Sequence, residues 1–345
     1  MQKDIIFHQL FEKESSTFTY IAADPDSKEG IIIDPVMETV ERDFSFILEQ
    51  DIKIKYILDT HVHADHVTSA GVLRQLLAAV TVVGKGAKVA CADILIDDGE
   101  ELSFGNYMIK ALATPGHTDS CTCYLLNDML FSGDTLLIRG NGRCDFQQGD
   151  AGMLFDSIKE KLYTLDPKTK VFPGHDYKGF LSSTIADEMK HNRRIRSETS
   201  KEEFQKIMDE LSLGLPAKIH QALPENLKCG IDASNFMDAK SGIAQLSFSF
   251  IKSMSGHFRL IDIRSDEEFQ AGLKINSAER LIFEEGFEQK LGKFSKEDKI
   301  IFVCKSGTRS VMAADNARKA GFKTVFSLKN GFEGLSENEL KGFKG

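Results

Sequence analysis

The sequence predicts an α/β protein with two domains, and three observations support this prediction. The chain has 345 residues, of which 41% are hydrophobic, so it can form two cores of ordinary size. Short apolar runs that end in Asp or His fill much of the first two-thirds of the chain. The last third instead alternates strand-like with helix-like patterns. We therefore expect a larger domain over residues 1–235 and a smaller one over residues 240–345.

Apolar runs in the larger domain predict strands that end at a polar edge. The first two are "GIIIDPV" (30–36) and "IKIKYILDTHVH" (52–63), and a helical stripe follows over "VTSAGVLRQLLAAV" (67–80). The further strand candidates are broken by Gly, Pro and Asn. They are "TVVGKG" (81–86), "YMIKALATPGH" (107–117), "CTCYLLND" (121–128), "MLFSGDTLL" (129–137) and "KVFPGHD" (170–176).

A change of pattern marks the boundary between the two domains. Residues 183–211 form a charged region predicted to be helical, and residues 211–236 concentrate Gly, Pro and Asn without clear periodicity. Such a stretch is typical of a linker, so we place the boundary near 235–240. The smaller domain then gives strand, strand-loop-helix and strand, the order of a compact α/β unit. Its segments are "HFRLIDIRSDEEF" (257–269), "KIIFVCKSGTRSVMAADNARKAG" (299–321) and "KTVFSLKNGFEGL" (323–335).

Composition excludes several functional classes. Lys and Arg number 43 against 52 Asp and Glu, which gives a net charge of -9 without a basic block. Nucleic acids and anionic membranes are therefore not expected partners. The N-terminus lacks a basic region followed by an apolar core, and no stretch approaches the roughly 20 apolar residues of a membrane span. We expect a cytoplasmic enzyme whose six scattered cysteines are thiols.

Histidines and aspartates gather where predicted strands of the larger domain end. The stretch "DTHVHADHV" (59–67) is the densest group, and "TPGH", "FSGD" and "FPGH" repeat the pattern at later strand ends. Strand ends converge at one edge of a sheet, so these side chains predict a metal site. The candidate ligands are His61, His63, Asp65, His66, His117, Asp134 and His175.

This ordered set, His-x-His-x-Asp-His followed by Gly-His, Gly-Asp and Gly-His, resembles the metallo-β-lactamase superfamily. The resemblance covers most of residues 1–235 and implies an αββα sandwich, but it does not fix the reaction. If every candidate binds metal, two zinc ions bridged by Asp134 can generate a hydroxide that attacks a thioester, as in glyoxalase II. If two histidines and one carboxylate bind, they form a facial triad around iron(II) that leaves positions for O2 and a sulfur substrate.

The flanking segments favour iron. "GDTLLIRGNGRCDFQQG" (133–149) and "GHDYKGF" (174–180) resemble the persulfide dioxygenase branch, whose members oxidise glutathione persulfide to sulfite. That resemblance implies that His61, His117 and Asp134 hold one Fe2+. It leaves the candidates His63, Asp65, His66 and His175 as outer partners that orient the ligands.

Substrate contacts are implied by the same flanks. The resemblance points to Arg143 and Tyr177, because glutathione carries carboxylates that a guanidinium can grip in bidentate fashion. A surface salt bridge for Arg143 and a packed ring for Tyr177 remain the alternatives. Cys144, Cys121 and Cys123 are interpreted as packing residues rather than as a nucleophile or metal ligands.

The smaller domain carries a predicted nucleophile, Cys304. It ends an apolar strand just before a helix, where backbone N–H groups and the cations of Lys305 and Arg309 favour a thiolate. The Cys-x4-Arg loop, with "LIDIRSDEEFQAG" and "NGFEGL", resembles rhodanese sulfurtransferases and implies their parallel sheet. Cys-x5-Arg phosphatases are the rival within this fold, but their loop is one residue longer. We assign Cys304 as catalytic, with Lys305 and Arg309 as substrate contacts.

Together, the two resemblances imply a fused persulfide dioxygenase and rhodanese. The expected substrates and products are glutathione persulfide, glutathione, thiosulfate or sulfite, and O2, and a homo-oligomer stays open. The first alternative is a dinuclear zinc hydrolase of thioesters with an appended sulfurtransferase. The second makes the smaller domain a sulfur-carrier or docking module without catalysis.

Overall fold

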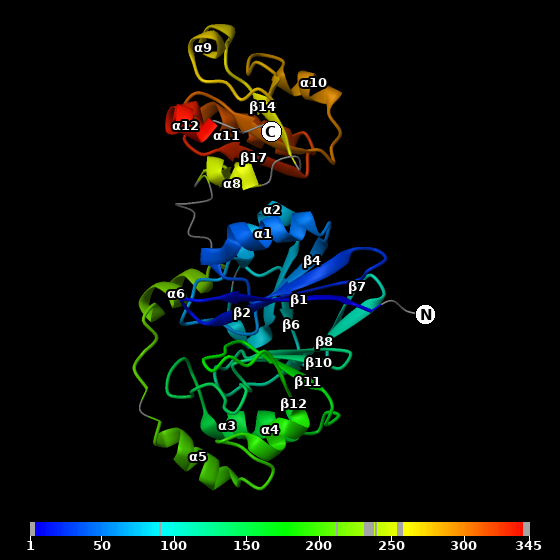
Figure 1. The fold of residues 1–345 in the computed structure, drawn as a ribbon, viewed down its shortest axis with the longest axis vertical. Coiled ribbons are helices and arrows are strands. Elements are labelled where there is room, and N and C mark those ends of the chain that lie inside the picture. The colour runs from blue at the N-terminus through cyan, green and yellow to red at the C-terminus, as the bar shows by residue number, and fades with distance from the viewer. Residues whose placement is uncertain are drawn as a thin grey trace. The chain divides into compact units, whose positions relative to one another are not determined.

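The computed structural model describes residues 4–89, 91–211, 213–230, 238, 240–253 and 258–340 (Figure 1). These residues form two compact units, one made mainly of residues before 231 and the other mainly of residues after it. Much of the predicted boundary at 235–240 lies outside the described residues, so the limits 1–235 and 240–345 stay a prediction.

The first unit begins with a six-stranded mixed sheet in the order β1-β2-β3-β4-β5-β6. Strands β1 to β3 pair antiparallel, whereas β3 to β6 run parallel. Parallel neighbours need a crossover, which α1 (Val40–Glu49) and α2 (Ala70–Leu77) provide. The strands are β1 (Ile6–Glu12), β2 (Thr17–Ala23), β3 (Glu29–Ile33), β4 (Lys53–Leu58), β5 (Val80–Gly84) and β6 (Ile94–Ile96).

A second six-stranded sheet has the order β12-β11-β10-β9-β8-β7. Only its β10–β11 pair is parallel among the described strands. The two sheets face each other across a core of apolar side chains contributed by both, including Ile33, Leu58, Phe104 and Phe131. The strands are β7 (Glu101–Phe104), β8 (Tyr107–Ala113), β9 (Thr122–Leu126), β10 (Met129–Gly133), β11 (Lys170–Pro173) and β12 (Ser183–Thr184).

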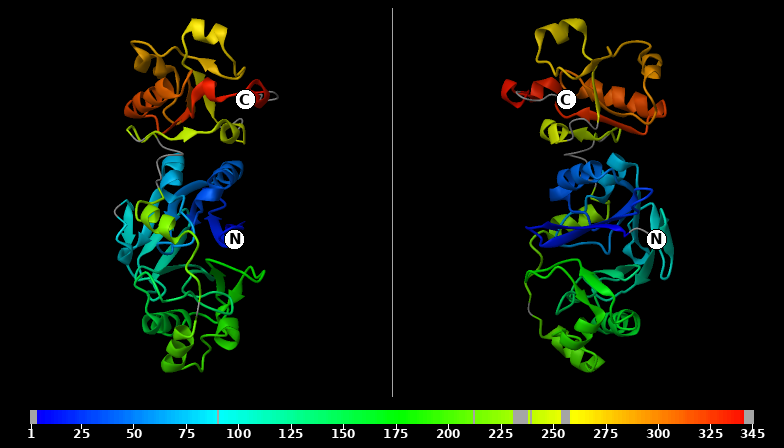
Figure 2. Two further views of the ribbon diagram at one scale, coloured as in Figure 1. Left: turned by 90° about the vertical axis from the view of Figure 1, so that its left-hand side faces the viewer. Right: turned by 45° about the vertical axis from the view of Figure 1, so that its right-hand side comes forward.

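Helices cover the outer faces of the two sheets (Figures 1 and 2). On the second sheet, Leu154, Ile158, Ile185 and Phe204 pack against strand residues such as Leu130 in a separate core. The helical region predicted over 183–211 contains two helices, α4 and α5. A helix also forms within the stretch that showed no periodicity. The remaining helices of this unit are α3 (Ala151–Asp156), a π-helical turn (Ser157–Leu162), α4 (Ile185–His191), α5 (Lys201–Asp209) and α6 (Ile219–Asn226).

The second unit is built on a five-stranded sheet in the order β13-β17-β16-β14-β15, and every pairing in it is parallel, as predicted. Its core includes Ile261, Phe287, Phe302 and Phe322. Its strands are β13 (Gln245–Leu246), β14 (Arg259–Asp262), β15 (Glu279–Arg280), β16 (Lys299–Val303) and β17 (Thr324–Leu328). Its helices are α8 (Phe248–Ser253), α9 (Asp266–Ala271), α10 (Phe287–Lys290), α11 (Thr308–Lys319) and α12 (Glu337–Leu340).

A capping box starts helix α9 and gives a stability prediction. The Ser265 hydroxyl accepts from the Glu268 N–H, and the Glu268 carboxylate accepts from the Ser265 N–H. We expect Ser265→Ala to lower the free energy of unfolding of this unit by about 1 kcal/mol. Scanning calorimetry checks this, with Ser200→Ala at the cap of α5 as the matched control in the first unit. An unshifted transition for Ser265→Ala combined with a shifted one for the control would contradict the role of this cap.

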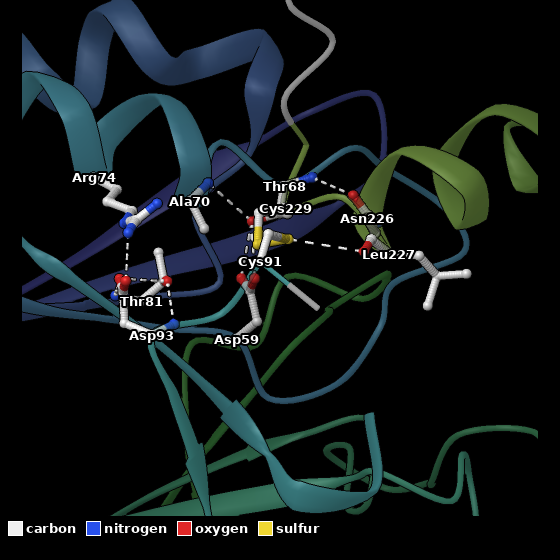
Figure 3. Close-up of a disulfide and its surroundings, with 10 residues drawn as sticks. All are labelled: Asp59, Thr68, Ala70, Arg74, Thr81, Cys91, Asp93, Asn226, Leu227 and Cys229. Atoms are coloured by element: carbon white, nitrogen blue, oxygen red, sulfur yellow. Dashed lines mark hydrogen bonds and ion pairs between the residues drawn. A yellow bond between two sulfur atoms is a disulfide. The ribbon is translucent and has the colours of Figure 1, made fainter. Parts of the chain in front are cut away.

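The prediction that all six cysteines are thiols is wrong. Cys91 and Cys229 form a disulfide with an S–S distance of 2.11 Å, whereas Cys121, Cys123, Cys144 and Cys304 are free (Figure 3). The disulfide partners lie 138 residues apart, and the fold brings the segment before β6 to the end of α6. Sequence spacing contains no trace of such a pairing.

None of the helices in the described part of the chain combines the length and the apolar character that a membrane crossing requires.

Candidate metal centre and cysteine loop

The parallel strand pairs bring the predicted metal ligands together. In the first sheet Ile33 of β3 pairs with Leu58 of β4, so the segment after β4 that holds the histidine cluster lies beside Asp34. In the second sheet Gly133 of β10 pairs with Pro173 of β11, which sets Asp134 next to the segment of His175. Backbone hydrogen bonds then join the two sheet edges. They run from the Thr122 N–H to the Thr60 carbonyl and from the Phe18 N–H to the Gly174 carbonyl, each 2.8 Å long.

His61, His117 and Asp134 form one compact ligand group. Each offers a ligand atom that lies within 4.8 Å of the others. Both histidines are buried, with exposures of 3% and 5%. These are the residues that the sequence resemblance implied, and two imidazoles with one carboxylate make a facial donor set.

Neighbouring groups fix the tautomer of both imidazoles. His117 Nδ1 donates to the Arg143 carbonyl at 2.6 Å, which leaves Nε2 as the free ligand atom. Thr60 Oγ1 donates to the Asp34 carboxylate and therefore accepts from His61 Nδ1, at 3.0 Å. Burial and the adjacent imidazoles lower the pKa of His61 well below its ordinary value. A neutral ring with a defined tautomer is the form that binds a metal.

Buried atoms without hydrogen bonds test whether a cation fits this group. Asp134 Oδ1, His66 Nε2 and His63 Nδ1 are buried and have no hydrogen-bond partner. Buried polar atoms normally have partners, so unpaired carboxylate and imidazole atoms in both neighbouring ligand groups fit the coordination of a cation. The residues therefore fit a metal.

His63 forms an ion pair with Asp34 beside the first ligand group. Its Nε2 contacts the Asp34 carboxylate at 3.1 Å, and both side chains are 1% exposed. Burial alone would lower the pKa of His63, but the charge and hydrogen bond of Asp34 outweigh it and raise this pKa to about 9. Burial also raises the pKa of the nearby Asp59 to about 7. His63, Asp65 and His66 also lie close enough to form a second ligand group, in which His63 can offer Nδ1 because only its Nε2 is paired with Asp34.

The other outer residues form a chain of contacts around Asp134. His66 Nδ1 lies 3.0 Å from Asp65 Oδ2, and His175 Nε2 lies 3.6 Å from the same atom and 3.5 Å from Asp134 Oδ1. Thr17 Oγ1 lies 3.3 Å from Nδ1 of both His66 and His175. Burial opposes the ionisation of Asp65, yet the neighbouring imidazoles hold its pKa well below the ordinary value.

A cavity of about 570 Å³ opens beside this centre. Its lining includes His117, Asp134, His175 and Tyr177, and 70% of the Tyr177 side chain is exposed. The Tyr177 ring is stacked on the His175 ring with their centroids 6.0 Å apart. The cavity volume is typical of small-molecule sites.

Arg143 also lines the cavity, but its guanidinium is already engaged. It forms a bidentate pair with Asp145 and donates to the carbonyls of Leu213 and Gly214. The salt bridge that the sequence left open for Arg143 is therefore present. Its backbone has a further role, because its carbonyl orients His117.

Sequence reasoning missed Arg194 on the same cavity wall. Its Nη1 donates to the Asn141 carbonyl at 2.6 Å. Within the described residues no carboxylate forms an ion pair with it, and burial lowers the pKa of this guanidinium. The signal that could have found Arg194 is the cluster "HNRRIR", which only the fold places next to the flanks of Asp134.

The three free thiols of the first unit are packing residues, as predicted. Burial raises the pKa of Cys121 to about 12, of Cys123 to about 11 and of Cys144 to about 12. Cys123 Sγ donates to the Ser132 carbonyl within the second sheet. A thiol with such a pKa is neutral at physiological pH and is a poor nucleophile.

Cys304 directly follows β16, and its sulfur faces the N-terminus of α11. The sulfur accepts from the N–H groups of Gly307 at 3.1 Å and Ser310 at 3.3 Å. The Ser310 hydroxyl lies 3.3 Å from the same sulfur and 2.8 Å from the Ser327 hydroxyl. Backbone donors of the predicted kind are therefore present around the sulfur.

The loop after Cys304 is closed by the segment "NGF". The Phe332 N–H donates to the Cys304 carbonyl at 2.9 Å. Gly331 has a φ of +56°, and a Cβ there would lie 2.4 Å from the same carbonyl, so only glycine fits.

Lys305 and Arg309, the predicted substrate contacts of this loop, each face a glutamate. Arg309 Nη2 binds both carboxylate oxygens of Glu268 at 2.6 and 2.8 Å, and Lys305 Nζ lies 3.7 Å from Glu333. The Glu268 pair anchors Arg309 against the N-terminus of α9. Both cations remain partly exposed beside the cysteine loop.

Comparison with known families matches both halves of the chain. The metallo-beta-lactamase superfamily model matches residues 13–175, and the rhodanese-like domain model matches residues 250–338. Both matches confirm the predicted fold class.

Individual relatives show which members of the superfamily this chain resembles. Human "Persulfide dioxygenase ETHE1, mitochondrial" is 45% identical over 229 residues, which are 66% of this chain and 89% of that protein. The crystal structure of ETHE1 from Myxococcus xanthus has 46% identity and a TM-score of 0.63, and it covers 65% of this chain and 99% of that one. A metallo-beta-lactamase structure from Staphylococcus aureus has 20% identity and a TM-score of 0.61, and it covers 94% of this chain and 98% of that one. The last likeness concerns the fold alone.

Proposed function

Because this chain belongs to the metallo-β-lactamase superfamily, among relatives of the ETHE1 persulfide dioxygenases, and carries a rhodanese-like domain, we propose that it oxidises glutathione persulfide and transfers sulfane sulfur. The first reaction would use O2 and water at one Fe2+ held by His61, His117 and Asp134. It would yield sulfite and glutathione. The second would proceed through a persulfide on Cys304.

The observation that carries the proposal is the grouping of two imidazoles with one carboxylate beside the cavity. His61 and His117 each have Nδ1 hydrogen-bonded, which leaves Nε2 as the ligand atom near Asp134. These three residues can form a facial triad, and two of them, His117 and Asp134, line the cavity. Iron(II) held by these residues would supply the redox chemistry that oxidation by O2 requires and that zinc lacks.

The residues of this chain would bind and orient the substrate. We expect the persulfide sulfur to lie next to Asp134 and His117, which line the cavity. Tyr177, which also lines it, can contact the peptide, and Arg143 can bind a carboxylate if the substrate replaces Asp145. The reaction balances, since glutathione persulfide, O2 and water give glutathione, sulfite and protons, and the outer sulfur supplies the four electrons that reduce O2.

Substitution of Arg194 tests how the cavity binds the carboxylates of glutathione persulfide. The Arg194 guanidinium lines the cavity and has no carboxylate partner among the described residues. A carboxylate of the substrate can therefore pair with it. We expect Arg194→Gln to raise KM for glutathione persulfide about tenfold to a hundredfold, the worth of a charge-assisted hydrogen bond, with little change in kcat. Steady-state O2 uptake measures both constants.

Arg196→Gln is the matched control for this prediction, since Arg196 pairs with Glu198 at 3.3 Å and does not line the cavity. An equal KM for native protein and Arg194→Gln would remove Arg194 from the substrate site. A fall in kcat alone would point to a catalytic rather than a binding defect.

Sulfur transfer would use the cysteine loop. The Cys304 thiolate, stabilised by the N–H groups of Gly307 and Ser310, attacks the outer sulfur of thiosulfate. The S–S bond of thiosulfate breaks, sulfite leaves with the bonding pair, and Cys304 becomes a persulfide. A glutathione thiolate then takes the outer sulfur, which regenerates the Cys304 thiolate and produces the substrate of the first reaction. Lys305 and Arg309 would hold the anionic donor.

The alternative functions each rest on a specific observation. A second ligand group, His63, Asp65 and His66, keeps the dinuclear zinc hydrolase as a candidate, and one relative, Dictyostelium "Glyoxylase B2", is 30% identical. A non-catalytic carrier role for the second unit is the other candidate, since Lys305 and Arg309 are already paired with glutamates. O2 uptake on glutathione persulfide tests the first alternative, and thiosulfate-dependent transfer tests the second.

A further inference from the structure

A buried asparagine at the end of α6 binds the backbone of the histidine loop. Asn226 is 3% exposed, and its Nδ2 donates to the carbonyls of His63 at 2.8 Å and His66 at 2.9 Å. Its Oδ1 accepts from the Thr68 N–H at 2.9 Å (Figure 3). One side chain therefore ties the loop at points on both sides of Asp65.

The residues that follow Asn226 lie against the same loop. The Gly71 N–H donates to the Cys229 carbonyl at 2.9 Å. Gly230 has a φ of +65°, and a Cβ there would lie 1.7 Å from the Thr68 carbonyl oxygen. Such close approach needs glycine and shows that residues 226–230 and the segment at Thr68 are fitted to each other.

Thr68 connects this contact to the start of the ligand cluster. Its hydroxyl donates to the buried Asp59 carboxylate at 2.9 Å and accepts from the Ala70 N–H at 3.1 Å (Figure 3). Asp59 lies two residues before His61. Displacement of the Asn226 segment would therefore disturb the loop from both of its ends.

The Cys91–Cys229 disulfide fastens the Asn226 segment to the body of the first unit. Cys229 is 4% exposed, and Cys91 is partly exposed. A small cavity of about 10 Å³, close to the space of one water molecule, separates the disulfide from the ligand loop. His61 and His63 of the loop line it together with Asn226 and Cys229. A release of Cys229 would open this cavity directly behind the ligands.

We propose that Asn226 is a positioning residue for the metal-ligand loop and that the Cys91–Cys229 disulfide holds it there, so that reduction by a thiol weakens metal retention. The inference rests on the proposed ligands His61, His117 and Asp134, but not on which reaction they support. Metal retention by the first unit would then fall as thiols such as glutathione, a product of the proposed reaction, reduce the disulfide.

The reduction is an ordinary thiol–disulfide exchange. A thiolate attacks Cys91 Sγ, the more accessible sulfur, and forms a mixed disulfide while Cys229 leaves as a thiolate and takes up a proton. A second thiol attacks the mixed disulfide and releases Cys91. Two thiols are thus oxidised to one disulfide as the protein disulfide is reduced to two thiols. Glutathione is a thiol of this class, and dithiothreitol serves in the experiment.

Iron release to an excess of ferrozine tests the disulfide without any turnover. Iron(II)-loaded protein is reduced with dithiothreitol, desalted anaerobically and compared with the unreduced form. We expect release about tenfold faster after reduction, within the range known for outer partners of metal ligands. Cys91→Ser should release iron at the fast rate before and after treatment, and Cys304→Ser should keep the difference. Equal rates for the reduced and unreduced native protein would overturn the proposal.

Asn226→Asp tests the positioning role with a side chain of the same shape. It keeps an acceptor for the Thr68 N–H but loses both donors to the His63 and His66 carbonyls. We expect iron release about tenfold faster or more, together with a lower thermal transition, because a buried carboxylate would face two carbonyl oxygens. Native release rates in this variant would refute the role of Asn226. If the protein holds zinc instead of iron, the same release is followed with a zinc indicator, so failure of the proposed function is recognised separately.

Discussion

Asp134→Ala should abolish O2 consumption on glutathione persulfide and leave the protein without stoichiometric iron. Asp134 is the only carboxylate in the ligand group that faces the cavity, and its Oδ1 is a buried acceptor without a hydrogen-bond partner. Its removal leaves two imidazoles, which is too few for a facial triad. The decrease in iron affinity should therefore exceed the roughly 10- to 100-fold decrease that substitution of an outer partner causes. Iron analysis and an oxygen electrode measure the two effects.

His63→Ala is the matched control for this variant. The His63 imidazole lies in the same cluster but outside the group of His61, His117 and Asp134, so under the proposed assignment it acts only as an outer partner. We expect this variant to keep about one iron per chain at saturating metal, with affinity reduced about 10- to 100-fold. Loss of all iron from His63→Ala, or native iron content and O2 uptake in Asp134→Ala, would show that the ligands are assigned wrongly.

Cys304→Ser should abolish thiosulfate-dependent sulfur transfer to glutathione and leave O2 uptake on added glutathione persulfide unchanged. Serine keeps the size of the side chain, but its hydroxyl is a weak nucleophile that cannot carry sulfane sulfur. The backbone donors at Gly307 and Ser310 stay in place. Transfer should fall to the uncatalysed background, measured as sulfite released from thiosulfate.

Cys123→Ser is the control for this second prediction. Cys123 is a buried thiol whose pKa burial raises to about 11, and it lies in the second sheet of the first unit. Its replacement should leave sulfur transfer intact. Retained transfer in Cys304→Ser would make the second unit a carrier or docking module rather than a catalyst.

Much of the metal centre could be predicted from sequence because its residues end strands. The parallel pairs β3–β4 and β10–β11 bring "DTHVHADHV" and the Gly-Asp and Gly-His motifs to neighbouring edges. The cysteine loop was equally readable, since a strand, a Gly and an amphipathic helix occur within one short segment. In both cases the chemistry follows from local sequence and the general geometry of parallel sheets.

The features that sequence missed all depend on long-range contacts. Asn226 lies more than 150 residues from the carbonyls that it binds, and the disulfide joins residues 138 apart. Arg194 reaches the cavity only through the path of the chain between α4 and α5. Asp34 was read as the end of a strand, yet its carboxylate orients His61 through Thr60 and holds His63.

Metal content and oxygen consumption of the native protein test the central claim most directly. The protein is purified anaerobically, its metals are quantified, and O2 uptake is followed on addition of glutathione persulfide. We predict one iron per chain, with one O2 consumed and one sulfite formed for each persulfide oxidised. Two zinc ions per chain without any O2 consumption would contradict the proposal and favour a thioester hydrolase.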